Sequence, residues 1–206
     1  TIAHNTLKKW VSRIHQASDI TLAPSKWACR DLEQSGVKNV RLWKRGVDLV
    51  NFTPARRDES LRSNIAGSKE KLIVGYVGRI ANEKRIDDLK ILDQQEDIQL
   101  VIVGDGPAAP RIKKELPGAR FVGYQSGTEL ARYVASFDIF VHTGKHETFC
   151  QGIQEALASG VPVRYVVDCL QLLGELTVLP YVCLCSASLV KDVLLELPKR
   201  LLLPLP

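Results

Sequence analysis

The chain has 206 residues, of which 45% are hydrophobic, 25% charged and 6% aromatic, and its net charge is +5. This balance excludes a disordered or collagen-like chain, and the length suits one complete α/β domain with part of a neighbouring one. The small positive charge suits a phosphate-bearing ligand or an anionic membrane surface, but it does not indicate nucleic-acid binding.

Apolar runs and cysteines set two further limits. No uninterrupted apolar run approaches the roughly 18 residues of a membrane span, and the sequence opens on an amphipathic stretch rather than a secretory signal, which predicts a cytoplasmic protein. The five cysteines form an odd set without metal-type spacing, so we expect reduced thiols and neither a disulfide framework nor a zinc site.

Residues 1–46 predict alternating helices and strands. The expected elements are an amphipathic helix over 7–16, a strand over 19–23, a helix over 27–34 and a strand around 40–42. Ser25 is the expected N-cap of the second helix, and Gly36 is expected to end it. The mostly polar segment 47–70 lacks periodicity and predicts an interdomain linker.

Residues 71–163 alternate strands and helices in a regular order. The predicted strands are 71–77, 98–103, 120–122, 138–141 and 161–163, and the predicted helices are 84–92, 108–115, 128–136 and 148–158. Short apolar strands that alternate with helices predict an α/β fold with a doubly wound parallel sheet. Ligands of such sheets bind beyond the carboxyl ends of the strands, so we expect the function in the loops that follow them.

The last 43 residues, 164–206, differ from the rest in composition, with 14 leucines, three cysteines and a single glycine. They resemble neither a surface helix nor a sixth strand with its glycine-bearing loop. Two explanations stay open. Either the stretch is a divergent C-terminal subdomain, or the reading frame shifts just after Val163, where leucine and cysteine become abruptly frequent. With suitable codon choices, residues 171–175 read Ala-Ala-Gly-Gly one frame over, which is close to the glycine-bearing loop that is missing.

The loop after the first predicted strand of this region combines Gly78, Arg79 and Lys84. Arginine offers a planar fork to phosphate oxygens and lysine a mobile point charge, and both precede a predicted helix N-terminus. The pattern suits a nucleotide diphosphate whose charge grows as it departs. The alternative is a pair of solvated surface charges.

The next strand-end loop satisfies the dinucleotide pattern Gly-x-Gly-x-x-Gly/Ala at Gly104, Gly106 and Ala109. A dinucleotide-dependent oxidoreductase is therefore an alternative function, although the acidic residue expected about 20 positions on is absent. The glycines equally suit a simple turn from strand to helix, with Pro107 in the first helical turn.

Segment 142–156 carries two glutamates, Glu147 at a helix start and Glu155 eight residues on, about 12 Å along the axis. That separation suits a nucleotide sugar lying along the helix, with its oxygens held by the free amides of Phe149, Cys150 and Gln151. Exposed helical acids are the alternative.

Two other sites are conceivable in the same segment. His142 and His146 lack a third ligand at suitable spacing, so we expect no metal site. Cys150 lacks an identifiable base and orienting partner, which favours a packed small residue over a thiol nucleophile.

Four motifs in this order resemble the donor-binding domain of retaining GT-B glycosyltransferases of family 4. They are Gly78-Arg79 with Lys84, Val103-Gly104-Asp105-Gly106-Pro107, Phe121-Val122-Gly123, and Glu147 with Glu155 followed by 156–163. Segments 17–25 and 42–48 resemble the same family's passage from acceptor domain to donor domain. Segment 142–151 is most similar to actinobacterial mannosyltransferases that use GDP-mannose on lipid acceptors.

The resemblance implies a division into the end of a second Rossmann-like domain (1–46), a linker (47–70) and a donor-binding domain (71–163). It implies that Arg79 and Lys84 hold the donor diphosphate, that Glu147 grips the sugar hydroxyls and that Glu155 holds the ribose. Tyr124 or Gln125 would lie against the base. The family uses no metal and no protein cofactor, and it transfers the sugar with retention of configuration.

The predicted function is transfer of a hexosyl group, specifically mannosyl from GDP-mannose, to a lipid or glycan acceptor. This chain supplies the donor-binding portion and is not expected to turn over alone. Besides the oxidoreductase, a noncatalytic scaffold or relic fragment stays open. A lipid acceptor would bring the protein to the inner face of the plasma membrane, where the basic helix from Lys8 to His15 would touch lipid or pack on the rest of the acceptor domain.

Overall fold

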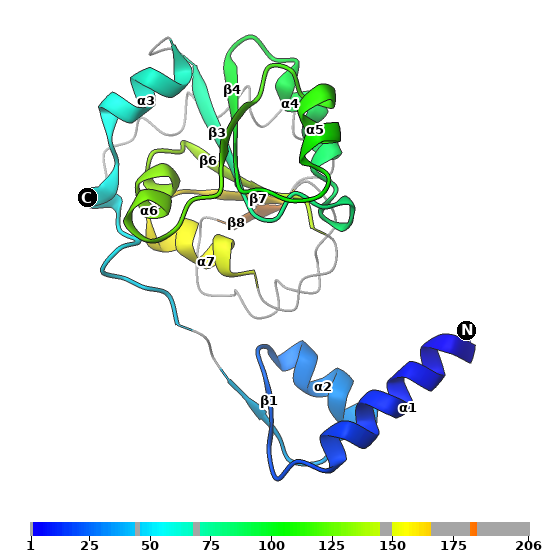
Figure 1. The fold of residues 1–206 in the computed structure, drawn as a ribbon. Coiled ribbons are helices and arrows are strands. Elements are labelled where there is room, and N and C mark those ends of the chain that lie inside the picture. The colour runs from blue at the N-terminus through cyan, green and yellow to red at the C-terminus, as the bar shows by residue number, and fades with distance from the viewer. Residues whose placement is uncertain (1, 44–45, 68–70, 145–149, 166–181, 185–206) are drawn as a thin grey trace. The chain divides into compact units, whose positions relative to one another are not determined.

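A computed structural model of the chain describes residues 2–43, 46–67, 71–144, 150–165 and 182–184, drawn as a ribbon in Figure 1. The chain forms two compact units. Of the residues described, the first unit contains 2–43, 46 and 150, and the second contains 47–67, 71–144, 151–165 and 182–184.

The first unit pairs two helices with a small parallel sheet. Its elements are α1 (Ile2–Gln16), β1 (Thr21–Ala23), α2 (Lys26–Gln34) and β2 (Val40–Leu42), with β1 parallel to β2. The hydroxyl of Ser25 accepts a hydrogen bond from the Ala28 amide at 3.1 Å, which confirms the predicted N-cap. Gly36 follows the end of α2 with φ of +85°. Trp10 on α1 is 65% exposed.

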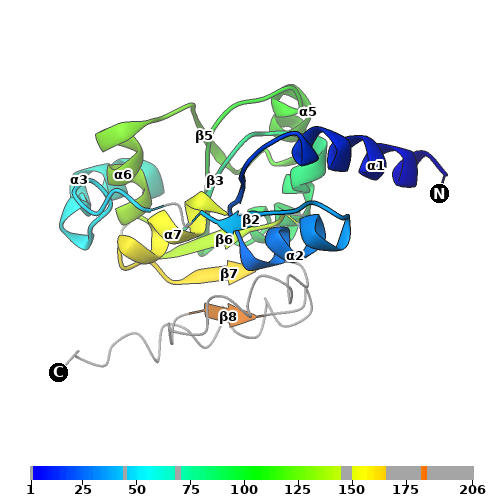
Figure 2. The ribbon, with the colours of Figure 1, turned by 90° about the horizontal axis from the view of Figure 1, so that it is seen from below.

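The second unit contains a six-stranded sheet in the order β5-β4-β3-β6-β7-β8, in which every neighbouring pair is parallel. The strands are β3 (Leu72–Val77), β4 (Ile98–Val103), β5 (Arg120–Gly123), β6 (Ile139–His142), β7 (Val163–Tyr165) and β8 (Val182–Leu184). Figure 2 shows β7 and β8 side by side at one edge. The predicted doubly wound parallel sheet is confirmed.

Helices cover both faces of this sheet. They are η1 (Pro54–Arg56), α3 (Glu59–Ala66), η2 (Asn82–Lys84), η3 (Ile86–Leu89), α4 (Lys90–Asp93), α5 (Ala109–Glu115), α6 (Gly127–Ala135) and α7 (Gln151–Ala158), where η denotes a 3-10 turn. The apolar side chains of one face pack against buried residues of η3, α4 and α5. On the other face Phe137 lies so close to β3 that a Cβ on Gly75 would fall 2.1 Å from its ring, so only glycine fits there.

The expected helix over 84–92 is wrong in detail. Two 3-10 turns and one α-helical turn replace it, because Arg85 adopts a left-handed backbone with φ of +50° and separates η2 from η3. A left-handed residue cannot continue a right-handed helix, so the chain changes direction directly after Lys84.

Part of the segment expected as a linker is integrated into the second unit. Arg57 and Arg62 form ion pairs with the two carboxylate oxygens of Asp138 at 3.1 and 3.0 Å, and the Ile73 amide donates to the same carboxylate at 2.8 Å. We call this group the Asp138 clamp. With Leu61 of α3 buried as well, the clamp fixes this part of the chain at the amino ends of β3 and β6.

The leucine-rich tail also contributes to the sheet. β7 continues to Tyr165, past the expected strand end at Val163, and β8 supplies a sixth strand that composition did not predict. The remaining residues of the tail, and with them segment 171–175 of the predicted frame shift, lie outside the described chain. None of the helices described is both long and apolar enough to cross a bilayer.

Candidate functional site

The strand order creates a switch point beside β3. After β3 the chain builds β4 and β5 on one side, then crosses back and places β6 on the other side. Loops that leave β3 and β6 therefore diverge to opposite sides, and the crevice between them is where open parallel sheets bind ligands. The loop carrying Gly78, Arg79 and Lys84 follows β3, and the segment from Thr143 follows β6.

Backbone hydrogen bonds hold the β3 loop against the β4 loop. The Gly78 amide donates to the carbonyl of Val103 at 3.0 Å, and the Ile80 amide donates to the carbonyl of Asp105 at 2.9 Å. In return, the Ala108 amide donates to the Ile80 carbonyl at 3.0 Å. The start of the β3 loop thus continues the pairing of β3 and β4 beyond the sheet.

These contacts explain the glycine pattern after β4. A Cβ on Gly104, where φ is +135°, would lie 2.0 Å from the Gly78 carbonyl oxygen, and a Cβ on Gly106 would lie 2.3 Å from that of Ile80. Both positions therefore require glycine because two backbones approach closely there, a reason that neither interpretation of the motif had given. The expected place of Pro107 is wrong, since α5 begins at Ala109 and the proline lies in the turn before it.

The two predicted cations occupy different positions on the β3 loop. Arg79 is exposed, and its guanidinium forms no ion pair with any residue that the structure describes. Lys84 is half-buried at the end of η2, immediately before the left-handed Arg85. An exposed arginine and a half-buried lysine on one strand-end loop suit a diphosphate.

A buried threonine joins the two sides of the switch point. Thr143 directly follows β6, is 0% exposed, and donates a hydrogen bond from its hydroxyl to the backbone carbonyl of Lys84. No sequence pattern singles out Thr143 by itself. The available signal was a polar residue directly after the four buried residues of β6, in a loop already expected to carry the function.

Helix α7 supplies the acidic side of the site. It begins at Gln151, whereas the expected helix began at Thr148. Glu155, one turn further on, is half-buried. Burial raises the pKa of Glu155, although a hydrogen bond with the Gln151 side chain opposes the shift. Cys150 is half-buried directly before the helix. Glu147 and Phe149, both predicted site residues, lie outside the described part of the chain.

Tyr124 lies at the carboxyl end of β5, two strands from β3 in the sheet. It is 75% exposed and follows Gly123, whose φ is +74° and whose carbonyl accepts a hydrogen bond from the Gly104 amide at 2.8 Å. The neighbouring Gln125 donates from its side chain to the Val122 carbonyl at 3.1 Å. Tyr124 therefore offers a free aromatic face at the same edge of the sheet as the β3 loop.

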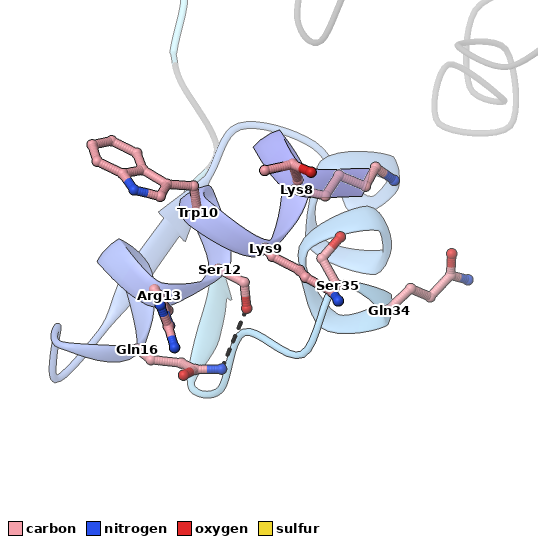
Figure 3. Close-up of a pocket in the computed structure, with 9 residues that line it drawn as sticks. Lys8, Lys9, Trp10, Ser12, Arg13, Gln16, Gln34 and Ser35 are labelled. Carbon is pink, nitrogen blue, oxygen red and sulfur yellow. Dashed lines mark hydrogen bonds between the residues drawn. The ribbon is translucent and has the colours of Figure 1, made fainter. Parts of the chain in front are cut away.

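Two further features bear on ligands. Among the residues that the structure describes, no group of three or more His, Cys, Asp or Glu could hold a metal ion. A separate polar hollow lies in the first unit, where Lys8, Lys9, Ser12, Arg13 and Gln16 of α1 line it with residues of α2 (Figure 3). It includes none of the predicted site residues.

A family model described as "Glycosyl transferases group 1" matches residues 58–164, about half of the chain. A GDP-mannose-dependent alpha-mannosyltransferase of Corynebacterium glutamicum is 47% identical over 154 residues, which cover 75% of this chain and 37% of that protein. A protein of the same name from Mycolicibacterium smegmatis is 46% identical over 79% of this chain and 43% of its own length. The chain thus spans about two fifths of these relatives.

More distant matches extend the comparison. The sulfoquinovosyl transferase SQD2 of Arabidopsis thaliana is 37% identical over 73% of this chain and 31% of its own length. Among solved structures, Anabaena HepE in complex with UDP-glucose superposes with a TM-score of 0.76 at 16% identity, covering 97% of this chain and 60% of that one. Sucrose-phosphate synthase from Thermosynechococcus elongatus gives 0.74 at 22% identity, covering 97% and 53%. These structural likenesses concern the fold.

Proposed function

This chain belongs to the group 1 glycosyltransferases, and from that premise we propose that its second unit binds the nucleotide-sugar donor of a hexosyl transfer. The observation that carries the proposal is the switch point itself. Arg79 and Lys84 leave β3 there, and Thr143 of the opposite loop contacts the backbone of Lys84. Cationic groups at the carboxyl end of a parallel sheet are well placed for a diphosphate.

We propose GDP-mannose as the donor, and mannosyl transfer to a lipid or glycan acceptor with retention of configuration as the reaction. Support comes from relatives near 47% identity that carry GDP-mannose in their names, and from a phosphatidylinositol dimannoside mannosyltransferase of Mycobacterium tuberculosis at 34% identity. A lipid acceptor would bring a cytoplasmic enzyme to the inner membrane face, with the basic helix α1 as the element available for contact.

In this proposal the two cations act on the leaving group. As the bond between the sugar and the diphosphate breaks, negative charge grows on the departing phosphate oxygens. The fork of Arg79 and the ammonium of Lys84 then bind more strongly than in the ground state, which lowers the barrier. Cations that the loop already holds in place need not rearrange during the reaction. The catalytic effect of Arg79 and Lys84 therefore depends on how well the loop positions them.

The remaining predicted residues complete the donor site. Glu147 is proposed to hold the sugar hydroxyls, and the backbone amides of Phe149, Cys150 and Gln151 the phosphate or sugar oxygens. The half-buried carboxyl of Glu155 is proposed to accept hydrogen bonds from the ribose, and exposed Tyr124 offers a surface for the base. A carboxylate sheltered from water makes stronger hydrogen bonds with sugar hydroxyls than an exposed one.

Calorimetric titration of the folded chain with GDP, UDP and NAD tests the proposal. We expect GDP to bind more tightly than UDP, and Arg79→Ala to weaken GDP binding by about tenfold or more, because it removes a charged hydrogen-bond partner of the phosphates. Arg30→Ala is the matched control, since it deletes an exposed arginine of α2 in the first unit.

Three outcomes separate the alternatives. If Arg30→Ala weakened GDP binding as much as Arg79→Ala does, the loss would come from the change in net charge and not from a contact between Arg79 and the phosphates. A preference for NAD would favour the oxidoreductase, and a folded chain that binds none of the three nucleotides would favour the noncatalytic scaffold.

A further inference from the structure

The loop that carries both cations is held from two directions. At its start, the amides of Gly78 and Ile80 are bonded to the β4 loop. At its end, the carbonyl of Lys84 accepts the hydrogen bond from the Thr143 hydroxyl beyond β6. The first attachment belongs to the backbone and is present with any side chain that fits, whereas the second depends on one hydroxyl group.

The local backbone explains why the second attachment matters. Within η2, the Lys84 amide donates to the Ala81 carbonyl at 3.0 Å and the Arg85 amide to the Asn82 carbonyl at 3.2 Å. The 3-10 turn ends there, because Arg85 is left-handed. Carbonyls at the end of a helical turn point beyond it and require a donor from elsewhere, and Thr143 provides one from the opposite side of the switch point.

Burial makes this bond selective. Thr143 is fully buried, so its hydroxyl has no bulk water to fall back on and must bond within the protein. Valine has nearly the same shape but no hydroxyl, and it would fill the same space while leaving the Lys84 carbonyl without this donor. Serine would keep the hydroxyl and lose only a methyl group.

We infer that Thr143 is a positioning residue of the donor site, whose hydroxyl fixes the backbone of Lys84 so that its ammonium meets the donor diphosphate. The inference rests on the proposed function. Thr143 acts through Lys84 rather than on the nucleotide. Its loss should therefore raise the conformational freedom of the β3 loop and weaken diphosphate binding without disturbing the sheet.

The test compares Thr143→Val, Thr143→Ser and the control Ser136→Ala. Ser136 is a fully buried residue just before β6, and its hydroxyl donates to the Arg132 carbonyl at 2.7 Å and accepts from the Asp58 amide at 3.1 Å. The control thus deletes a buried hydroxyl with backbone partners at the opposite end of the same strand. We expect GDP affinity to fall about tenfold in Thr143→Val and to stay within about twofold in the other two variants.

A double-mutant cycle distinguishes positioning from general damage. In a Lys84→Ala background, Thr143→Val should cause no further loss of GDP affinity, because the group through which it acts is gone. An undiminished effect in that background would overturn the inference. Equal GDP affinity of the wild-type chain and Thr143→Val would overturn it as well.

Hydrogen exchange gives a readout that needs no nucleotide. Amides of residues 78–86 should exchange faster in Thr143→Val than in the wild-type chain or Thr143→Ser. Unchanged exchange would refute the attachment itself. If the wild-type chain binds no nucleotide while the exchange difference is present, the proposed function and the role of Thr143 in it fail, but the attachment stands.

Discussion

The two sides of the switch point are built differently. On the β4 side, Gly104 and Gly106 bring backbone against backbone, with no room for even one additional carbon. On the β6 side, the contacts are made by side chains: the hydroxyl of Thr143 bonds the Lys84 carbonyl, and the ring of Phe140 lies nearest to Gly152 of α7. One side is a fixed support, and the other is where the chemistry of individual side chains acts. Substitutions should therefore affect folding on the first side and ligand binding on the second.

Gly104→Ala should have the largest effect on stability. The added Cβ would meet the Gly78 carbonyl oxygen at 2.0 Å, and φ of +135° disfavours any L side chain. We expect the free energy of unfolding to fall by about 3 kcal/mol or more, because backbone atoms on both sides must move. Urea denaturation checks this value, and a loss below about 1 kcal/mol would show that the two loops separate easily.

Glu155→Gln should have a smaller effect of opposite sign. Burial raises the pKa of Glu155 above the usual value of 4.5, so the folded state holds its proton more tightly than the unfolded state. The free energy of unfolding therefore falls as pH rises from below 4.5 through the folded pKa, because Glu155 ionises. This loss of stability persists at neutral pH.

Glutamine removes that loss, so we expect the variant to be more stable than the wild-type chain at pH 7, by about 0.5 kcal/mol, and equally stable in acid. Thermal melts at several pH values measure the difference. GDP affinity should fall in the same variant if the carboxylate holds the ribose. A difference in stability that is independent of pH would mean that the charge of Glu155 plays no part.

Gly152→Ala should have the smallest effect and is the direct counterpart of Gly104→Ala. Here the added Cβ would lie 3.2 Å from Cζ of Phe140, a ring that can shift by a few tenths of an ångström. Alanine also favours a helix by up to about 1 kcal/mol over glycine, which offsets the crowding. We expect a change within about 0.5 kcal/mol by urea denaturation, and a loss near that of Gly104→Ala would erase the contrast between the two sides.

The sequence predicted the sheet because its strands are buried on both faces and separated by amphipathic helices, a pattern with few other solutions. It did not predict the interruption after Lys84, since arginine has no intrinsic preference for the left-handed backbone that Arg85 adopts. It also placed the whole of α3 in a linker, because the charges of Arg57 and Arg62 look like solvated residues until Asp138 is seen beside them.

Within the proposed site, sequence patterns draw attention to residues whose chemistry is distinctive and pass over Thr143, whose chemistry is ordinary. Arg79 and Lys84 stand out as cations after an apolar strand, and the predicted loop does carry them at the switch point. Thr143 is one polar residue among many. Its importance depends on the distance between two loops that are about 60 positions apart in the chain, which no local pattern encodes.

The Asp138 clamp has a practical consequence for dissecting this protein. Because Arg57 and Arg62 form ion pairs with Asp138 at the amino end of β6, a fragment that starts after residue 62 would expose Asp138 and remove the buried side chain of Leu61. A fragment that starts at Val47 keeps every one of these contacts. The shortest useful expression fragment of the second unit therefore begins well before its first strand, at a boundary set by two arginines rather than by the sheet.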